Sequence, residues 1–369
     1  MNVIYYQTKT KFTNTGDVLI NKAMIEMLRN YGNIKCNCEN NIPDYFINEL
    51  DIKESEKIKV KNEFSLAFDI LKTAKKLNKN GNKVYIVSGL GHTFGNGIKK
   101  NIRNIIAYIF FSIYKLYGVK IVRIGISLGP LGGILSKTEK IRSKKVDYYY
   151  VRDTKSLELC NEIGINNARL CPDLSWIYDN KNKRKFNPNQ SICINLRKSI
   201  LDNDEPLSYL EAMLKRCSDI LNILNYDKSK KLFFCYQVDE DKEFSKFCYN
   251  YFNSKYDCVY IEDKITLFSA GNIYSKCSFN ISNRMHSLLL GYKYGALPIA
   301  LIDQKKHIKI HQTLKDNGLE KLSIDVYRGN DKSINYINNN SKKLASKLFL
   351  VEKERQKEIL NILDRIFEK

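Results

Sequence analysis

The residues best suited to chemistry lie at positions 281–287 (ISNRMHS), where an arginine and a histidine stand two positions apart. The pattern predicts a buried strand at 277–282 and a helix at 285–294, so Arg284 and His286 fall in the turn between them. Parallel α/β sheets bind ligands outside the carboxyl ends of their strands, where free N–H groups and the helix dipole favour anions. Arg284 adds a planar fork for a carboxylate or phosphate, and His286 exchanges protons near neutral pH. The turn predicts an anion site, although an arginine capping a strand and a histidine packed on the helix would leave the same pattern.

Strand-like apolar runs alternate with helical ones along the chain, which is typical of βαβ units and parallel sheets. In the first half, this alternation predicts strands at 2–6, 83–88, 120–126 and 148–151 and helices at 17–31, 63–78, 102–117 and 155–163. A polar linker is predicted at 179–190, and the second half predicts strands at 191–196, 232–236, 258–261, 277–281 and 297–302 and a long helix at 341–367. We expect an α/β protein with two doubly wound, Rossmann-like domains facing a cleft, at 1–178 and 191–369.

Five further motifs accompany the arginine–histidine turn in a fixed order. They are Asn14-Thr15-Gly16-Asp17, the segment 125–130 (GISLGP), Val151-Arg152-Asp153 with Ser156, Pro172-Asp173, and Ile194-Asn195-Leu196-Arg197. After the turn come Gly295-Ala296-Leu297-Pro298, an apolar strand and Lys305. From Asn14 to Lys305 this order resembles the polysaccharide pyruvyl transferase family. The resemblance implies a fold like that of GT-B glycosyltransferases, with the donor held by the second domain and the acceptor facing the first.

The resemblance also implies a reaction. Members of the family transfer the carboxyethylidene group of phosphoenolpyruvate to two hydroxyls of a sugar, which forms a cyclic ketal and releases phosphate. Arg284, Met285 and His286 are assigned by resemblance to the donor site, and Arg197 and Arg152 are further cations for the donor's two anionic groups. His286 is the candidate acid or base, since a bound anion would keep its ring protonated near neutrality; a purely electrostatic role is the alternative. Arg197 could instead be a surface arginine after an edge strand.

Carboxylates and a glycine-rich segment are the candidates for the acceptor side. Asp17 and Asp173 are predicted to contact acceptor hydroxyls or to act as a base, although Asp17 could equally cap its helix. Asp153 is expected to be a helix cap or part of an ion pair. Gly89, Gly91 and His92 belong to a predicted loop at 89–95 that fits neither the dinucleotide nor the P-loop fingerprint. Two departures from the family, Ser88-Gly89-Leu90-Gly91-His92 in place of a glycine run and Asp173-Leu174 in place of Asp-Pro, leave the acceptor open.

Composition restricts the classes of partner. The formal charge is +21, with 43% hydrophobic and 27% charged residues, as in a globular protein. Basic clusters at 137–145, 181–185 and 305–309 come with no recognisable nucleic-acid module, so we expect no specific nucleic-acid partner. General solvation or peripheral contact with an anionic membrane would also explain the charge. No secretory signal opens the sequence and its cysteines are scattered, which favours a cytoplasmic protein, with the inner membrane face as a further location.

Neither a metal nor a cofactor is expected beyond phosphoenolpyruvate as donor substrate. His307 and His311 lie four apart on a predicted helix, and we expect them to be exposed rather than to bind a metal. The apolar stretch 105–117 (IIAYIFFSIYKLY) is too short to span a bilayer, so a core helix is favoured over an interfacial one. Two other functions remain open: a GT-B glycosyltransferase that uses nucleotide sugars, and a non-catalytic basic binding protein.

Overall fold

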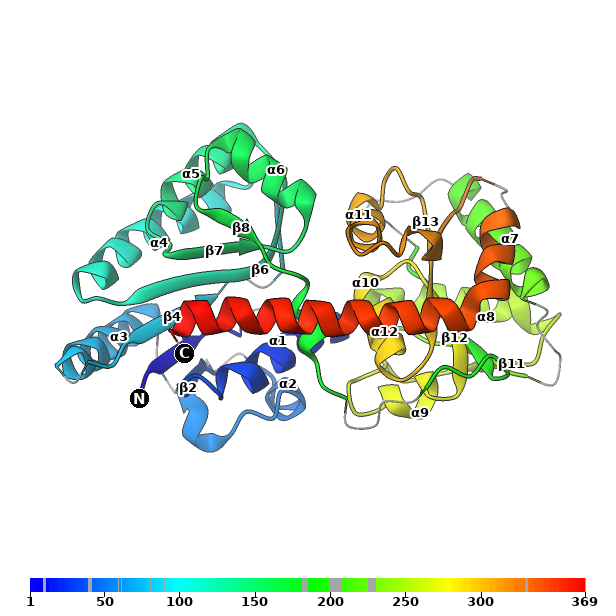
Figure 1. Cartoon of the computed structure of the whole chain (residues 1–369), viewed down its shortest axis with the longest axis horizontal. Helices are drawn as coiled ribbons and strands as arrows, with labels where there is room; N and C mark the ends of the chain where they lie inside the picture. The colour runs from blue at the N-terminus through cyan, green and yellow to red at the C-terminus, as the bar shows by residue number, and fades with distance from the viewer. Residues whose placement is uncertain are drawn as a thin grey trace. The chain divides into compact units, whose positions relative to one another are not determined.

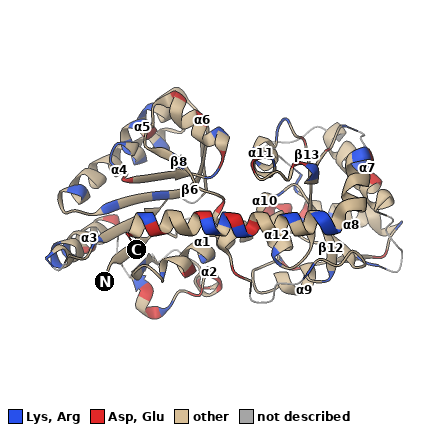
Figure 2. Cartoon of the chain, viewed as in Figure 1, with Lys and Arg blue, Asp and Glu red and all other residues tan. Residues whose placement is uncertain are grey.

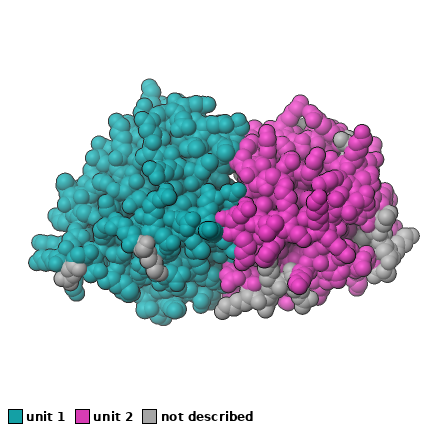
Figure 3. Space-filling model, in the orientation of Figure 1, with its two compact units in different colours: residues 1–12, 20–178, 355–369 teal, residues 13–19, 179–354 magenta. Residues whose placement is uncertain are grey.

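The structure, a computed structural model, describes residues 1–8, 11–38, 42–58, 60, 62–79, 81–88, 91–180, 185–198, 207–224, 230–328 and 331–368. The chain divides into two compact units, shown in Figure 3. Unit 1 comprises Met1–Phe12, Ile20–Tyr178 and Arg355–Lys369, and unit 2 comprises Thr13–Leu19 and Asp179–Glu354. The division after Tyr178 is the expected one. Two short segments depart from the expected ranges, because residues 13–19 pack with the second sheet and the last residues of the chain with the first.

Unit 1 contains an eight-stranded parallel sheet in the order β3-β2-β1-β4-β6-β7-β8, with β5 paired to β6. The strands are β1 (Val3–Tyr6), β2 (Asn33–Asn37), β3 (Lys57–Ile58), β4 (Val84–Ser88), β5 (Gly91–Gly95), β6 (Lys120–Leu131), β7 (Tyr148–Val151) and β8 (Ala168–Leu170). The middle strands β1 and β4 are buried almost throughout, as expected when helices cover both faces of a parallel sheet. Residues 91–95 were expected in a loop; instead they form β5, because they pair with Ile126–Leu131 of β6.

The helices of unit 1 surround this sheet (Figure 1). They are α1 (Thr15–Leu28), whose first turn belongs to unit 2, α2 (Asp44–Glu49), α3 (Glu63–Asn78), α4 (Ile98–Leu116), α5 (Gly133–Ser143) and α6 (Thr154–Ile163), with short 3-10 turns η1 (Glu54–Glu56) and η2 (Leu174–Ile177). One core cluster joins the inner faces of α3 and α6 to the strands, for instance Ile70 and Cys160 with Tyr5 and Ile121.

Unit 2 contains a six-stranded parallel sheet in the order β11-β10-β9-β12-β13-β14. The strands are β9 (Ser191–Asn195), β10 (Leu232–Phe234), β11 (Cys258–Tyr260), β12 (Cys277–Ser282), β13 (Leu297–Ile302) and β14 (Ser323–Asp325). From β9 the chain adds β10 and β11 on one side of the sheet, and then β12, β13 and β14 follow on the other side of β9. The boundary between β9 and β12 is therefore the topological switch point, which is where open α/β sheets bind ligands.

The helices of unit 2 are α7 (Leu207–Ile223), α8 (Lys242–Asn253), α9 (Ala270–Tyr274), α10 (Met285–Lys293) and α11 (Ile308–Asp316), with 3-10 turns η3 (Asp239–Asp241) and η4 (Glu320–Leu322). Helix α12 (Asp331–Phe367) ends the chain and has residues in both units. No helix among the described residues is both long enough and apolar enough to span a bilayer. Every strand predicted for the second half is present, whereas β2, β3, β8 and β14 were not predicted.

Candidate functional site

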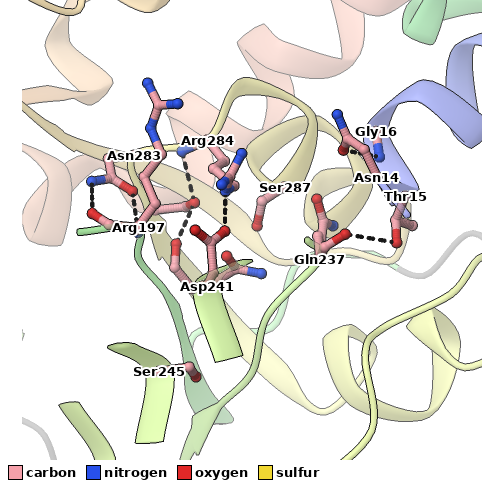
Figure 4. A network of polar contacts seen from close by, with 12 residues as sticks. Asn14, Thr15, Gly16, Arg197, Gln237, Asp241, Ser245, Asn283, Arg284 and Ser287 are labelled. Carbon is pink, nitrogen blue, oxygen red and sulfur yellow. Dashed lines mark hydrogen bonds and ion pairs between the residues drawn. The ribbon is translucent and has the colours of Figure 1, made fainter. Parts of the chain in front are cut away.

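Two arginines follow the two strands at the switch point of unit 2. Arg197 comes after β9 and Arg284 after β12, and these strands are paired. The side chain of Asn283 ties the two strand ends together, since its Oδ1 accepts from Arg197 N at 2.8 Å and its Nδ2 donates to Arg197 O at 2.9 Å (Figure 4). Asn283 is buried, so this pairing fixes the position of the Arg197 backbone next to that of Arg284.

A serine holds the turn before α10 in a similar way. Ser282 Oγ donates to Asn195 O at 2.6 Å and accepts from Arg284 N at 3.0 Å. Arg284 is the N-cap residue of α10, in an extended conformation, and so Met285 and His286 open the helix as expected. The N–H groups of this first turn and the helix dipole favour an anion here.

The Arg284 guanidinium meets a buried carboxylate that was not anticipated from the sequence. Its Nε donates to Asp241 Oδ2, as Figure 4 shows. Burial raises the pKa of Asp241, although the Arg284 hydrogen bond and the charges of Arg284 and Arg197 act in the opposite direction. Two guanidinium groups therefore act on one buried acid. Asp241 ends η3 shortly after β10, and a polar residue following a strand end was the signal that could have found it.

The first turn of α1 packs in unit 2 against the arginine–histidine turn. Thr15 N donates to Gln237 O at 3.1 Å, and Thr15 Oγ1 donates to Ile265 O at 2.5 Å. A Cβ atom added to Gly16 would lie 2.5 Å from Nδ1 and 2.7 Å from Cβ of His286. Real Cβ atoms essentially never approach so closely. Glycine at position 16 is therefore a packing requirement of His286, which links the first motif of the chain to the last.

Asp17 is not the cap of α1. Asn14 has that role, because its O accepts from Asp17 N and Val18 N and its Oδ1 accepts from Gly16 N at 3.0 Å. Asn14 Nδ2 in turn donates to Asp17 Oδ1 at 3.1 Å. The alternative reading of Asp17 as a helix cap is thus wrong, and its role toward the acceptor or as a base stays a prediction. Its place is in unit 2, with Arg284 and His286, rather than in the first half of the fold.

Three of the other motifs meet in unit 1. Arg152 Nε donates to Ser127 Oγ at 2.6 Å, and Arg152 Nη1 donates to Asp173 Oδ2 at 3.2 Å. Ser127 Oγ donates to Asp153 Oδ2 at 2.6 Å. Asp153 is the N-cap of α6 and accepts from Ser156 N, so the prediction of a cap is confirmed. Arg152 and Asp173 are therefore partners of each other, and their assignments to donor and acceptor stay predictions.

His92 lies on β5, next to the end of β6. Its Nε2 is 2.6 Å from Gly129 O, and a carbonyl can only accept, so Nε2 carries a proton. Gly91 has a φ of 104°, a conformation that favours glycine. Gly89 lies outside the described residues. The acceptor contacts of Gly91 and His92 stay predictions.

His307 was expected to be exposed, which is wrong. It lies just before α11, after β13, the neighbour of β12, and only 4% of its surface is exposed. Asp303 N donates to its Nδ1 at 3.1 Å, so the neutral ring carries its proton on Nε2. Burial and the charge of Arg197 lower the pKa of His307 to about 4. Among the described residues Nε2 has no hydrogen-bond partner. A neutral, buried N–H donor therefore lies within the electrostatic reach of Arg197.

The site offers cations and hydrogen-bond donors rather than a metal cage. No group of three or more His, Cys, Asp or Glu side chains in the described part of the chain could hold a metal ion. The residues brought together in unit 2 are Arg197, Arg284, Met285 and His286 with Asp241 and the Gly16 turn. Such an arrangement can bind a small dianion and deliver a proton beside it.

Comparison with known proteins shows the family from the sequence and the fold from solved structures. The family model described as polysaccharide pyruvyl transferase matches residues 14–301. Among curated proteins, no sequence relative matches the chain. Similar solved structures include a co-structure of MnaA from S. aureus with UDP (8% identity, TM-score 0.55, covering 99% of this chain and 96% of that one). Anabaena Alr3699/HepE in complex with UDP is also similar (8% identity, TM-score 0.55, covering 100% of this chain and 99% of that one). So is a glycosyltransferase from Rickettsia africae ESF-5 (11% identity, TM-score 0.54, covering 100% of this chain and 96% of that one). At these identities the likeness shows the fold alone, which is GT-B-like.

Proposed function

Because the chain belongs to the polysaccharide pyruvyl transferase family, we propose that it transfers the carboxyethylidene group of phosphoenolpyruvate to a glycan or its lipid-linked precursor. The observation that supports this donor best is the pair Arg197 and Arg284 at adjacent strand ends, beside the N-terminus of α10. Phosphoenolpyruvate carries a carboxylate and a phosphate on one small molecule. Two guanidinium groups and the N–H groups at Met285 and His286 match that charge and shape.

The proposed reaction needs a proton donor close to the anions. One acceptor hydroxyl forms a bond to C2 of the donor while the methylene carbon takes a proton and becomes a methyl group. The second hydroxyl then attacks C2, the C–O bond to phosphate breaks, and the two hydroxyl protons are released. His286 is the proposed acid, since its imidazole can donate a proton and opens the helix beside the proposed anion site. Gly16 leaves the space that the imidazole occupies, and Asp17, in the same unit, is the proposed base or acceptor contact.

Arg284 has a second task in this proposal. While no donor is bound, its guanidinium is held by Asp241, and so it is oriented before the donor arrives. Preorganisation of this kind lowers the entropy cost of binding. Arg152 stays a predicted donor contact, and Asp173, Gly91 and His92, which all belong to unit 1, stay predicted acceptor contacts. The enzyme would act in the cytoplasm, where phosphoenolpyruvate is made.

A nucleotide-sugar glycosyltransferase is the second candidate. Two of the similar structures contain UDP, and glycosyltransferases of this fold also bind phosphate beside a helix N-terminus. The family match favours the pyruvyl donor, because it extends from the Gly16 motif beyond the arginine–histidine turn.

Calorimetric titration separates these candidates. We expect saturable binding of phosphoenolpyruvate and none of UDP-glucose or GDP-mannose. Binding of a nucleotide sugar without binding of phosphoenolpyruvate would identify a glycosyltransferase instead. Transfer itself is checked by phosphate release in the presence of glycan acceptors, with Arg284→Ala as the inactive control.

A further inference from the structure

Helix α4 shows an apolar stripe to solvent. Isoleucine and leucine side chains recur on one face at intervals of three and four residues, namely Ile102, Ile105, Ile106, Ile109, Ile113 and Leu116, and all are exposed. The exposed fraction reaches 76% for Ile98 and 84% for Leu116 at the two ends. The expectation of a core helix at 105–117 holds for one face only: Tyr114, Phe110 and Phe111 pack with the core cluster of unit 1, whereas the isoleucine stripe is exposed. A surface helix of a globular protein normally turns such a stripe toward the core.

The inward face of α4 carries two asparagines in addition to its aromatic core residues. Asn101 and Asn104 are buried, and Thr138 of α5 hydrogen-bonds to both, at 3.0 Å from Asn101 Oδ1 and 3.3 Å from Asn104 Nδ2. Asn104 Nδ2 also donates to Glu139 Oε2 at 3.2 Å. The guanidinium groups of Arg123 and Arg142 hold the buried Glu139. Rotating α4 to bury its stripe would break these buried contacts, so the outward orientation of the isoleucines is built into unit 1.

The neighbouring helices extend the apolar surface. On α3, Phe64 is 74% and Phe68 71% exposed, and the Phe64 ring lies 5.9 Å from that of Phe110 on α4. On α5, Ile134 and Ile141 are exposed. Large exposed apolar side chains gathered on three neighbouring helices favour an interaction site over a scatter of single residues.

Positive charge accompanies this surface and limits what can cover it. Helix α4 contains Lys99, Lys100, Arg103 and Lys115 and neither Asp nor Glu. Basic residues also outnumber acidic ones on α3 and α5, as the blue segments of Figure 2 show. A second copy of the chain would bring the same charges face to face. An anionic lipid surface instead attracts each of them, and basic residues beside an apolar helix face are typical of interfacial helices.

We propose that α4, flanked by α3 and α5, docks unit 1 on an anionic lipid bilayer, with the isoleucine stripe in the headgroup boundary and the basic residues on lipid phosphates or carboxylates. Docking on a membrane would explain why the acceptor is lipid-linked. Only this explanation rests on the proposed function; the docking itself does not. Unit 1, which carries the proposed acceptor residues Asp173, Gly91 and His92, would then be the unit held at the membrane.

Flotation of the full chain with vesicles tests the surface. We expect binding to phosphatidylcholine vesicles that contain phosphatidylserine, weaker binding at high ionic strength, and little binding to phosphatidylcholine alone. Ile105→Ser/Ile109→Ser should lower the partition coefficient about tenfold or more, since two buried aliphatic side chains are lost. Phe349→Ser/Leu350→Ser, at two exposed apolar positions of α12, is the matched control and should bind as wild type does.

Three outcomes would overturn the proposal: no wild-type binding to either vesicle, equal loss in both double variants, or a solution dimer that only the α4 variant abolishes. Calorimetry with phosphoenolpyruvate keeps this test separate from the proposed function. The α4 variant should bind the donor normally, and a wild type that binds vesicles without binding the donor would refute only the proposed function.

Discussion

Gly16 lies against the imidazole of His286, so closely that a Cβ atom at position 16 would be 2.5 Å from His286 Nδ1. The two residues are 270 positions apart in the sequence, yet both belong to unit 2. The contact joins the first turn of α1 to the first turn of α10 and leaves no space for another side chain. It explains physically why a glycine stands in the motif at 14–17.

Gly16→Ala should therefore displace His286 and lower the turnover number of the transferase. Phosphoenolpyruvate affinity should change less, because Arg197 and Arg284 do not depend on this contact. Steady-state kinetics and calorimetry measure the two effects. Gly133→Ala is the matched control, since a Cβ there meets nothing within 4 Å. Unchanged turnover in Gly16→Ala would refute a catalytic role for the position of His286.

Arg284→Lys should weaken phosphoenolpyruvate binding roughly 10- to 100-fold, because an ammonium group cannot reproduce a bidentate fork and a charge-assisted hydrogen bond is lost. Lysine still offers a positive charge to the buried Asp241, so the melting temperature should change little. Titration calorimetry and thermal unfolding of the same variant provide both numbers. Equal affinity of wild type and variant would exclude Arg284 from the donor site.

His286→Gln should leave the dissociation constant of phosphoenolpyruvate close to that of the wild type while lowering the turnover number by about 10²- to 10⁴-fold, the usual contribution of a general acid. A variant that loses binding instead would assign His286 an electrostatic role.

Donor binding should take up protons through Asp241. Burial already raises its pKa, and Arg284 and Arg197 counteract that rise. A bound anion adds negative charge nearby and offsets the positive charges of both arginines, so the pKa of Asp241 rises further. The affinity for phosphoenolpyruvate therefore increases as the pH falls. Calorimetry in buffers of different ionisation enthalpy counts the protons. Asp241→Asn should reduce the uptake; the same uptake in the variant would attribute it to other groups.

His307 should make the protein acid-sensitive. Burial is the main reason that its pKa in the folded state is lowered to about 4. In the unfolded chain the pKa is about 6.5. The contribution of the neutral ring to stability is therefore complete at pH values above 6.5 and is lost as the pH falls toward 4. The free energy of unfolding should drop by about 2 kcal/mol between pH 7 and pH 5 from this group alone. Urea titrations of wild type and His307→Gln measure the difference, and identical pH profiles would contradict it.

The arginine–histidine turn was predictable because it follows from local periodicity: an apolar strand, a polar break and an apolar helix. Asp241 and His307 were not, since each enters the site from a different strand end and only the strand order β10-β9-β12-β13 brings those ends side by side. The motif at 14–17 was recognised, but its packing in unit 2 depends on long-range backbone contacts of Thr15. For α4, the apolar content is visible in the sequence, but the prediction turned its isoleucines toward the core. In the structure Asn101 and Asn104 are buried instead, and the isoleucines lie on the exposed face.

A crystal structure of the chain with phosphoenolpyruvate tests the central claim most directly. We predict the donor at the switch point between β9 and β12 of unit 2, with its phosphate or carboxylate oxygens within hydrogen-bond distance of the guanidinium groups of Arg284 and Arg197 and its methylene carbon facing His286. A donor bound elsewhere, with Arg284 still paired to Asp241, would contradict this assignment of the site.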